Sequence, residues 1–215
     1  MRNKILGELY KNKENYISGE MLAKNLGISR TAVWKHINIL KKEGYIIETT
    51  PGKGYRLLET EDKLLPGEIE ILLGDNTIGK QVVYFESINS TNSYAKKEIG
   101  QLEDGTIVLA EKQTLGRGRR GKGWVSPKGT GIWVSLILKP DIPPREGIKM
   151  TQIAAAAVCE SIRKLTGLNA LIKWPNDIII NGKKVCGILT EMAGELNEIS
   201  YIIIGIGINV NMDNF

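Results

Sequence analysis

Four cationic side chains stand among four glycines in the segment QTLGRGRRGKG at positions 113–123, and Trp124 follows it directly. Arginine guanidinium groups form forked hydrogen bonds with phosphate and carboxylate oxygens, and glycines let a ligand approach the backbone closely. Such a loop suits a mobile lid over an anionic substrate. It also suits a solvated basic linker or a short segment that grips nucleic acid, so the loop alone leaves these alternatives open.

Nucleophilic catalysis with a histidine partner has little support in this sequence. His36 is the only histidine, and it falls in a basic helical stretch far along the chain from the loop. Cys159 and Cys186 lack metal-ligand spacing and fit buried small apolar residues in a reducing compartment. The sequence contains neither a P-loop nor a dinucleotide-binding glycine motif. We therefore expect any catalysis to be electrostatic and positional.

The distribution of charge separates a basic N-terminal part from a balanced remainder. Residues 1–60 hold 11 Lys and Arg against 6 Asp and Glu, whereas residues 61–215 hold 18 of each kind. No apolar run approaches the roughly 20 residues of a membrane helix, and the N-terminus lacks the apolar stretch of a secretory signal. We therefore expect a cytoplasmic protein with no membrane partner.

The elements of the basic part predict a winged helix-turn-helix domain over residues 1–62. Apolar residues recur at helical spacing over 2–11 and 19–26, and a third helix begins after Ser29 and ends at Gly44. Two β-rich runs then flank a Pro-Gly-Lys-Gly turn, as in a hairpin that packs against the helices.

The third helix of this domain has one face for the core and one that suits nucleic acid. Val33, Ile37 and Leu40 recur at i, i+4 and i+7 and predict the buried face. The opposite face carries side chains that reach base edges and phosphates. Binding of a protein partner remains the alternative, but the positive charge favours DNA. The candidate DNA-binding residues are Ser29, Arg30, Thr31, Trp34, Lys35 and, at the tip of the wing, Lys53.

Acidic residues and a proline in LLETEDKLLPGE place a domain boundary between Glu59 and Lys63, ahead of a second domain at 63–215. Strand patterns joined by tight turns outnumber helical ones there, which predicts an α+β mixed sheet rather than a doubly wound one. The expected strands cover 81–86, 106–113, 131–139, 170–180, 184–192 and 199–210, and the expected helices cover 66–73, 90–99 and 149–167.

Several short segments of the second domain each fit an ordinary helix start, turn or packing site when they are taken singly. In order they are ESINSTN, the basic loop, KWPND, GKKVCGILTE and GIGINV. Taken together, with the winged helix, the chain resembles the bifunctional biotin protein ligases and biotin-operon repressors. GRGRRGKGW, KWPND and KVCGIL are the specific signatures, and the resemblance runs from about Leu6 to Asn211. It implies a catalytic domain similar to class II aminoacyl-tRNA synthetases.

The resemblance implies an ATP-dependent ligase that forms biotinyl-5′-AMP and transfers biotin to a lysine of a biotin carboxyl carrier protein. It also implies a biotin-responsive repressor that binds operator DNA, a ligand-promoted homodimer, and Mg²⁺ that arrives with ATP. The loop suits this chemistry, because a guanidinium about 4 Å from a phosphate contributes roughly 4 kcal/mol at an effective dielectric constant near 20. Repulsion among its cations would leave the loop open without ligand, and an acyl-phosphate would order it as a lid.

Site residues are carried over from the resemblance at matching positions. Lys184, Arg119 and Arg117 would act on the reacting carboxylate and phosphate, and Lys183 is the alternative to Lys184 because only strand parity separates them. No separate metal site is expected. The ring system of biotin would be held by Ser90, Thr91 and Gln113, and Trp124 would stack on adenine. Mg-ATP would be oriented by Asn176 and Asp177. The pocket would be completed by Asn92, Gly116, Arg120, Gly187, Leu189, Gly205 and Asn209.

Two other functions remain open at this point. A DNA-binding sensor of biotinyl-AMP would bind ligand without turnover, and a lipoate-type acyltransferase with a fused regulator would transfer a different acyl group. The GRGRRGKGW loop argues against the second. The family pattern continues past Phe215, so we expect residues 63–215 to be a catalytic domain that is incomplete at its C-terminal end.

Overall fold

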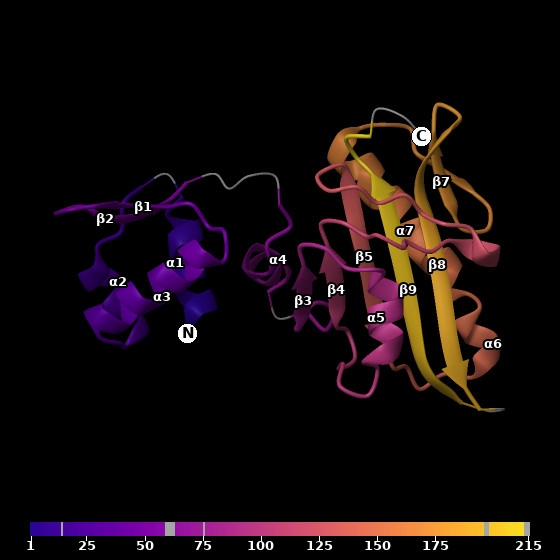
Figure 1. The fold of residues 1–215 in the computed structure, drawn as a ribbon, viewed down its shortest axis with the longest axis horizontal. Coiled ribbons are helices and arrows are strands. Elements are labelled where there is room, and N and C mark those ends of the chain that lie inside the picture. The colour runs from indigo at the N-terminus through magenta and orange to yellow at the C-terminus, as the bar shows by residue number, and fades with distance from the viewer. Residues whose placement is uncertain (14, 59–62, 75, 196–197, 213–215) are drawn as a thin grey trace. The chain divides into compact units, whose positions relative to one another are not determined.

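The computed structural model describes residues 1–13, 15–58, 63–74, 76–195 and 198–212. The chain divides into two compact units, Met1–Gly74 and Asp75–Phe215. The first consists of helices and a two-stranded sheet, and the second is built on a seven-stranded sheet, as Figure 1 shows. The predicted α+β class, a winged helix-turn-helix followed by a mixed sheet, is confirmed.

The helices of the first unit begin and end where the sequence indicates. Ser18 and Ser29 cap helices α2 and α3 by accepting from the backbone N–H groups of Met21 and Ala32, at 3.0 and 3.1 Å. Gly27 ends α2 at a φ of 64°, where a side chain would be strained. The elements of the unit are α1 Arg2–Lys11, α2 Gly19–Leu26, α3 Arg30–Lys42, β1 Ile47–Thr50, β2 Gly54–Leu57 and α4 Pro66–Leu73.

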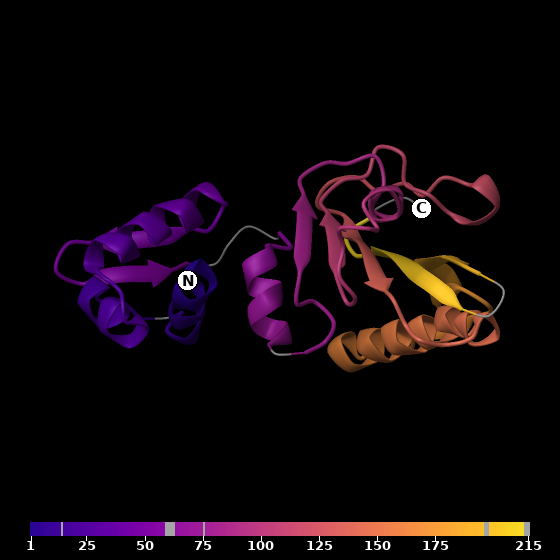
Figure 2. The same cartoon turned by 90° about the horizontal axis from the view of Figure 1, so that it is seen from below.

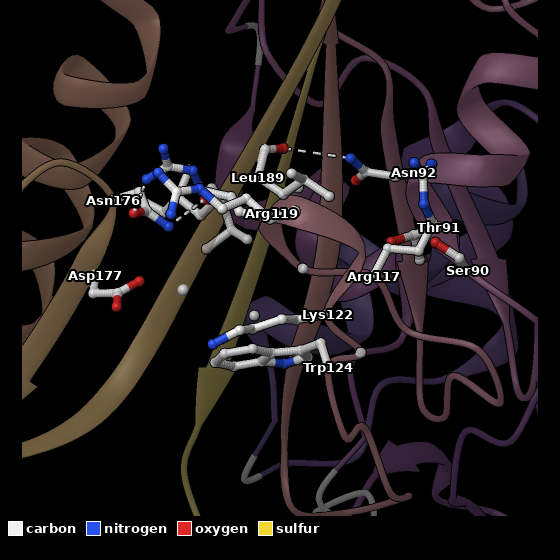
Figure 3. A pocket seen from close by; sticks show the side chains of 18 of the residues that line it. Ser90, Thr91, Asn92, Arg117, Arg119, Lys122, Trp124, Asn176, Asp177 and Leu189 are labelled. Carbon is white, nitrogen blue, oxygen red and sulfur yellow. Dashed lines mark hydrogen bonds between the residues drawn. The ribbon is translucent and has the colours of Figure 1, made fainter.

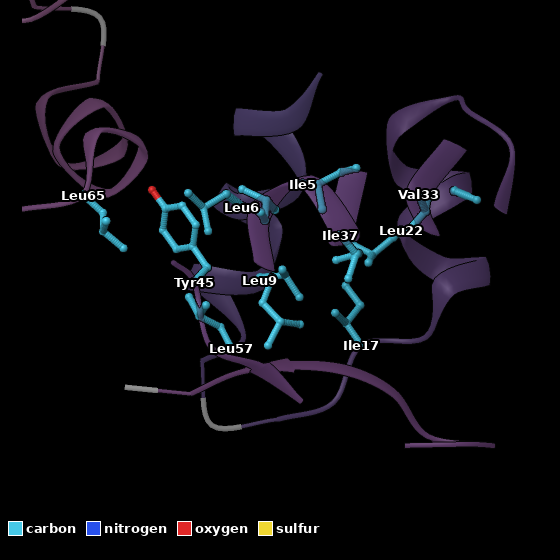
Figure 4. Packing of buried hydrophobic residues seen from close by; sticks show 13 residues of the cluster. Ile5, Leu6, Leu9, Ile17, Leu22, Val33, Ile37, Tyr45, Leu57 and Leu65 are labelled. Carbon is cyan, nitrogen blue, oxygen red and sulfur yellow. The ribbon is translucent and has the colours of Figure 1, made fainter. Parts of the chain in front are cut away.

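A single apolar core joins the three helices and the wing of this unit (Figure 4). Val33, Ile37 and Leu40 of α3 are fully buried in it, as predicted. The wing is the antiparallel pair β1 and β2. Its second strand also pairs with the segment before α2, because the backbones of Ile17 and Tyr55 exchange two hydrogen bonds of 2.9 Å. Strand β2 is therefore paired along both of its edges, by β1 and by Ile17.

Helix α4 packs with the first unit, although the sequence assigned it to the second domain. Leu65, its N-cap residue, is buried in the core of the first unit. The backbone N–H of Gly67 donates to the Tyr45 hydroxyl at 3.0 Å, in a contact too close to leave room for a side chain. The expected boundary at 59–63 falls largely on residues 59–62, which lie outside the described residues. The observed division between the two units comes later, after Gly74, because the contacts of Leu65 and Gly67 join α4 to the first unit. Gly67 and Tyr45 are 22 residues apart, so no local sequence pattern indicates their contact.

The second unit is a mixed sheet in the order β3-β4-β5-β9-β8-β7-β6. Only β3 and β4 are parallel, and the other neighbours are antiparallel. Its strands are β3 Val82–Phe85, β4 Ile107–Ala110, β5 Gly131–Leu138, β6 Leu171–Lys173, β7 Asp177–Ile180, β8 Lys183–Gly194 and β9 Ile199–Asn209. Its helices are α5 Thr91–Lys97, α6 Pro144–Gly147, the single 3₁₀ turn η1 Arg119–Gly121, and α7 Met150–Thr166.

Helices α5 and α7 lie on opposite faces of the sheet, as Figure 2 shows. Along β9, Ile202 and Ile204 pack with α7, whereas Ile203 packs with Ala95 of α5. This alternation is the period-2 pattern of a strand buried on both faces. Within the described part of the chain, none of the helices is both long and apolar enough to cross a membrane.

The single strand expected at 170–180 is wrong, because the segment forms two strands. β6 and β7 pair as an antiparallel hairpin around Trp174, Pro175 and Asn176. Pro175 has no N–H to donate to a ladder, so the turn forms at this point. The KWPND motif therefore lies at a tip of the sheet rather than within a strand.

Candidate active site

A cavity of about 750 Å³ lies on the α5 side of the sheet, and its floor is made of glycine backbone. Gly187 of β8 and Gly207 of β9 face each other directly, and Gly205 faces Leu189 one step further along. The Trp124 indole lies against this floor. A Cβ built on Gly207 would lie 2.4 Å from Trp124 Nε1, and one on Gly187 would lie 2.8 Å from its ring. Only glycine therefore leaves room for a flat ring here.

One end of the cavity is a network of polar groups at the start of α5. The Thr91 N–H and hydroxyl both donate to Gln113 Oε1, at 2.8 and 3.1 Å. The Gln113 amide donates in turn to the Ser126 hydroxyl at 3.0 Å. Buried Ser135 of β5 places its hydroxyl 2.8 Å from Thr91 Oγ1 and 2.6 Å from Asn92 Oδ1. These side chains therefore hold one another in place.

The basic loop connects β4 to β5 and is held by hydrogen bonds within itself. Gln113 pairs with Ser126, and Arg117 pairs with Gly123, as isolated bridges of a narrow hairpin. Its tip is the 3₁₀ turn, where Arg120 has a φ of 56°. The loop is folded in this structure, and its opening by charge repulsion in the absence of ligand stays a prediction. Partners on the sheet side offset the repulsion between the cations.

Two arginines of the loop point to opposite ends of the cavity (Figure 3). Arg117 forms a two-pronged ion pair with Glu191 of β8, with both N···O distances at 3.1 Å. Arg119 instead donates to Asn176 Oδ1 at 2.6 Å, beside the β6–β7 turn. The loop therefore spans the cavity from the α5 network to the KWPND motif.

Lys184 and Asp177 face each other at the second end of the cavity. Lys184 Nζ lies 2.8 Å from Asp177 Oδ1 and 5.1 Å from the centroid of the Trp124 ring. The lysine is thus held by a carboxylate and by the face of an aromatic ring. Its side chain is 43% exposed, so it remains open to a ligand.

An irregularity in β8 brings Lys184, rather than Lys183, to the cavity. Ile178 of β7 faces Cys186, but the next residue, Ile179, faces Lys184, so Val185 is an extra residue in the ladder. Strict alternation back from Gly187 would have brought Lys183 to this side. Lys184 lines the cavity and Lys183 does not.

Fourteen of the sixteen predicted substrate-binding residues line the cavity. Gly116 and Asn209 are the two that do not. A Cβ on Gly116 would lie 2.2 Å from the Trp124 carbonyl oxygen, so this glycine serves the close approach of the two loop strands. Asn209 ends β9 and pairs with Gly131. The predicted residues in the lining are Ser90, Thr91, Asn92, Gln113, Arg117, Arg119, Arg120, Trp124, Asn176, Asp177, Lys184, Gly187, Leu189 and Gly205.

Several lining residues were missed by the sequence reasoning. Gly207 could have been found, because it lies two positions after Gly205 and so shares its face of the strand. Trp174 and Pro175 belong to the KWPND motif but were treated as a turn. The other missed residues are Gly118, Lys122, Gly123, Val134, Ile188 and Ile206.

The site fits a ligand with a flat ring system and anionic groups. The cavity of about 750 Å³ supplies the space beside the Trp124 indole, and the loop and Lys184 supply the positive charge. The buried Trp124 Nε1 lies against the β9 backbone at Gly207 and has no hydrogen-bond partner among the described residues. Near the polar network of α5, the cavity offers hydrogen-bonding amides and hydroxyls to an uncharged ring.

The predicted DNA-binding residues lie in the first unit and form no part of this cavity. Ser29 caps α3, and the four other predicted DNA-binding residues of this helix are exposed. Trp34 is 56% exposed, which is unusual for so large an apolar side chain. Lys53 is exposed at the wing, with its Nζ 5.6 Å from the centroid of the Tyr16 ring. The exposed residues after Ser29 are Arg30, Thr31 and, further along, Trp34 and Lys35.

Comparison with known proteins agrees with this division of the chain. Residues 84–209 match the Biotin/lipoate A/B protein ligase family, and residues 1–56 match an HTH domain. The bifunctional ligase/repressor BirA of Bacillus subtilis (strain 168) is 47% identical over 210 residues, which cover 97% of this chain and 65% of that protein. BirA of Escherichia coli (strain K12) is 37% identical over 199 residues, which cover 91% of this chain and 60% of that protein. The chain thus spans less than two thirds of the length of these relatives.

Solved structures give the same fold for the second unit. The biotin protein ligase from Aquifex aeolicus in complex with biotin and ATP is 31% identical, with a TM-score of 0.54 over 63% of this chain and 55% of that one. The biotin protein ligase from Leishmania major in complex with biotinyl-5-AMP is 26% identical, with a TM-score of 0.55 over 63% of this chain and 60% of that one.

Proposed function

Because the chain belongs to the biotin/lipoate A/B protein ligase family, we propose that it is a biotin protein ligase that is also a biotin-responsive repressor. The ligase would form biotinyl-5′-AMP from biotin and ATP and pass biotin to a lysine of a biotin carboxyl carrier protein. One observation carries this proposal: Arg117, Arg119 and Lys184 converge on a single glycine-floored cavity. Two anionic substrates that must react with each other need such a concentration of positive charge.

The two ends of the cavity suit the two substrates. Ser90, Thr91 and Gln113 offer donors and acceptors to the ring system of biotin, with its carboxylate directed towards the basic loop. ATP would lie at the other end, with its adenine against Trp124 and its phosphates near Lys184 and Asn176. Mg²⁺ would arrive with ATP, and Asp177 is the carboxylate of this chain that is best placed to orient it.

In the first step, a carboxylate oxygen of biotin bonds to the α-phosphorus of ATP, and the bond from that phosphorus to the bridging oxygen breaks to release pyrophosphate. Lys184 and the loop arginines lower the repulsion between the two anions and stabilise the charge that builds up on phosphorus. Trp124 and the loop shield the mixed anhydride from water.

In the second step, the amine of the acceptor lysine attacks the carbonyl carbon of the adenylate. The bond from that carbon to the phosphate oxygen breaks, AMP leaves, and the amine loses a proton to a nearby carboxylate or to water. We assign no general base. The same cations stabilise AMP as the leaving group.

Repression would use the exposed face of α3 and the wing. The positively charged first unit supports binding to operator DNA, with Arg30, Thr31, Trp34 and Lys35 at the bases and Lys53 at a phosphate. Two copies in a ligand-promoted homodimer would engage half-sites separated by whole turns of about 34 Å. This function places the protein in the cytoplasm, with its DNA and its carrier protein.

One experiment separates this function from its alternatives. The protein is incubated with biotin, ATP, Mg²⁺ and a biotin carrier domain, and mass spectrometry measures both biotinyl-AMP and biotinylated carrier. Formation of both products is expected. A sensor would bind biotin and ATP without forming either product, and a lipoate-type transferase would modify its carrier with lipoate in a parallel reaction but not with biotin. The 47% identity to a bifunctional ligase/repressor supports the biotin reaction over the lipoate one.

A further inference from the structure

Glu191 is a carboxylate beside the cavity whose place in the reaction the proposed function leaves open. It lies on β8 and shares the cavity-facing side of that strand with Leu189 and Gly187, two and four positions before it. Its own atoms do not line the cavity. They instead contact two residues that do, Arg117 of the basic loop and Asn92 of α5.

We propose that Glu191 is a positioning residue that aims the Arg117 guanidinium at the carboxylate of the acyl substrate. This inference rests on the proposed function, because it names the substrate group that Arg117 receives. Glu191 holds the two terminal nitrogens of Arg117, with Nη1 3.1 Å from Oε2 and Nη2 3.1 Å from Oε1. An end-on pair of this kind fixes the plane of the guanidinium as well as its position.

The Glu191–Arg117 pair leaves one donor of the arginine for a ligand. Among the described residues, the Nε–H of Arg117 donates no hydrogen bond. With both terminal nitrogens held, the side of the guanidinium that includes Nε is available to a second carboxylate. Arg117 can therefore bridge Glu191 and the substrate without releasing either.

Glu191 also connects this arginine to the polar network at the start of α5. The Asn92 amide donates to Glu191 Oε2 at 3.0 Å, and Asn92 Oδ1 lies 2.6 Å from the Ser135 hydroxyl. The Ser135 hydroxyl is in turn 2.8 Å from Thr91 Oγ1. Through these contacts, the groups proposed for the substrate ring and the group proposed for its carboxylate are held at a fixed separation.

The position requires a group that only accepts hydrogen bonds. Oε1 of Glu191 accepts from Arg117, and Oε2 accepts from both Arg117 and Asn92. A glutamine would turn its NH₂ group towards one of these donors, and it would remove the charge that Arg117 faces. Glu191→Gln is nearly the same size, so it tests the electrostatic role with little change in packing.

The experiment compares two ligands that differ only at the carboxylate. Biotin and biotinol, in which an alcohol replaces the carboxylate, are titrated into the wild type and Glu191→Gln by calorimetry, and KM for biotin and kcat for adenylate formation are measured alongside. We expect Glu191→Gln to weaken biotin binding by about tenfold or more, as for loss of a charged hydrogen bond, and biotinol binding by less than about threefold.

Two further variants test whether the weaker binding of biotin comes from the position of Glu191 rather than from a general loss of negative charge. Glu160→Gln makes the same change of charge at an exposed position of α7, on the opposite face of the sheet, and should bind both ligands as the wild type does. Glu191→Asp keeps the charge but is one methylene shorter, so it should recover part of the selective loss. If Glu191→Gln fails to fold, Glu191→Asp is judged by the same comparison of the two ligands.

The outcomes are distinct. A loss confined to biotin supports the positioning role. An equal loss for both ligands, or no loss for either, overturns it, because Glu191 would then serve only the fold or nothing at this site. A wild type that binds neither ligand refutes the proposed function itself, and the positioning role with it.

Discussion

Gly205→Ala should destabilise the second unit and weaken ligand binding at the cavity together. A Cβ at this position would lie 2.2 Å from Asn92 Oδ1, 2.8 Å from its Cγ and 3.0 Å from its Nδ2. Asn92 cannot yield easily, since it is buried and its two ends are held by Ser135 and Glu191. The added methyl must therefore push the asparagine out of its network or distort β9.

The expected loss of stability follows from two contributions. Overpacking of a filled site costs about 1–3 kcal/mol. Each hydrogen bond broken at Asn92 costs about 1 kcal/mol more, so the free energy of unfolding should fall by about 2–5 kcal/mol. Biotin binding should weaken as well, because Asn92 lines the cavity.

The measurement is urea unfolding followed by tryptophan fluorescence in a Trp34→Phe background. The three remaining tryptophans, Trp124, Trp133 and Trp174, then all report on the second unit. The control is Gly100→Ala, which has no heavy atom within 4 Å of its added Cβ and should change stability by less than about 0.5 kcal/mol. A Gly205→Ala protein as stable as this control would refute the placement of Asn92 against β9.

Three further outcomes are expected. Arg119→Ala should release free biotinyl-AMP faster than the wild type, because the loop loses a forked donor to the phosphate, and an unchanged release rate would remove its role as a lid. Lys184→Ala should abolish adenylate formation while biotin still binds, and Lys183→Ala should not; the reverse result would show that the wrong lysine was assigned. Burial raises the pKa of the Cys186 thiol from 9.0 to about 12, so a thiol reagent should label it at pH 8 only after unfolding. Because the unfolded thiol loses its proton first, the free energy of unfolding should fall as the pH rises above about 9, and stability that stays constant up to pH 11 would contradict this.

Features set by neighbours in sequence were predicted well. The caps at Ser18 and Ser29 and the glycine at the end of α2 act within four residues of their partners, so the local pattern contains all the information needed. The same holds for the turn at Asn181 and Gly182 between β7 and β8, where both residues have a positive φ.

Features set by distant contacts were not predicted. Glu191 is 74 residues from Arg117, and no spacing rule connects them. The extra residue at Val185 depends on how β8 pairs with β7, so parity alone could not choose between the two lysines. The motif resemblance, rather than periodicity, supplied Lys184. Helix α4 was assigned to the second domain but packs in the first unit, because its apolar pattern predicts a buried face without indicating which of the two cores buries it.

The glycine floor of the cavity restricts how the ligand selectivity of this site could be changed. Gly187 and Gly207 contribute only backbone beneath the Trp124 indole ring, so that part of the wall contains no side chain that could be exchanged for another chemistry. Any larger residue at either position would fill the space that the ring needs. Altered selectivity must therefore be sought in the α5 network and the basic loop, and a mutant library that randomises the two glycines should yield mostly inactive proteins.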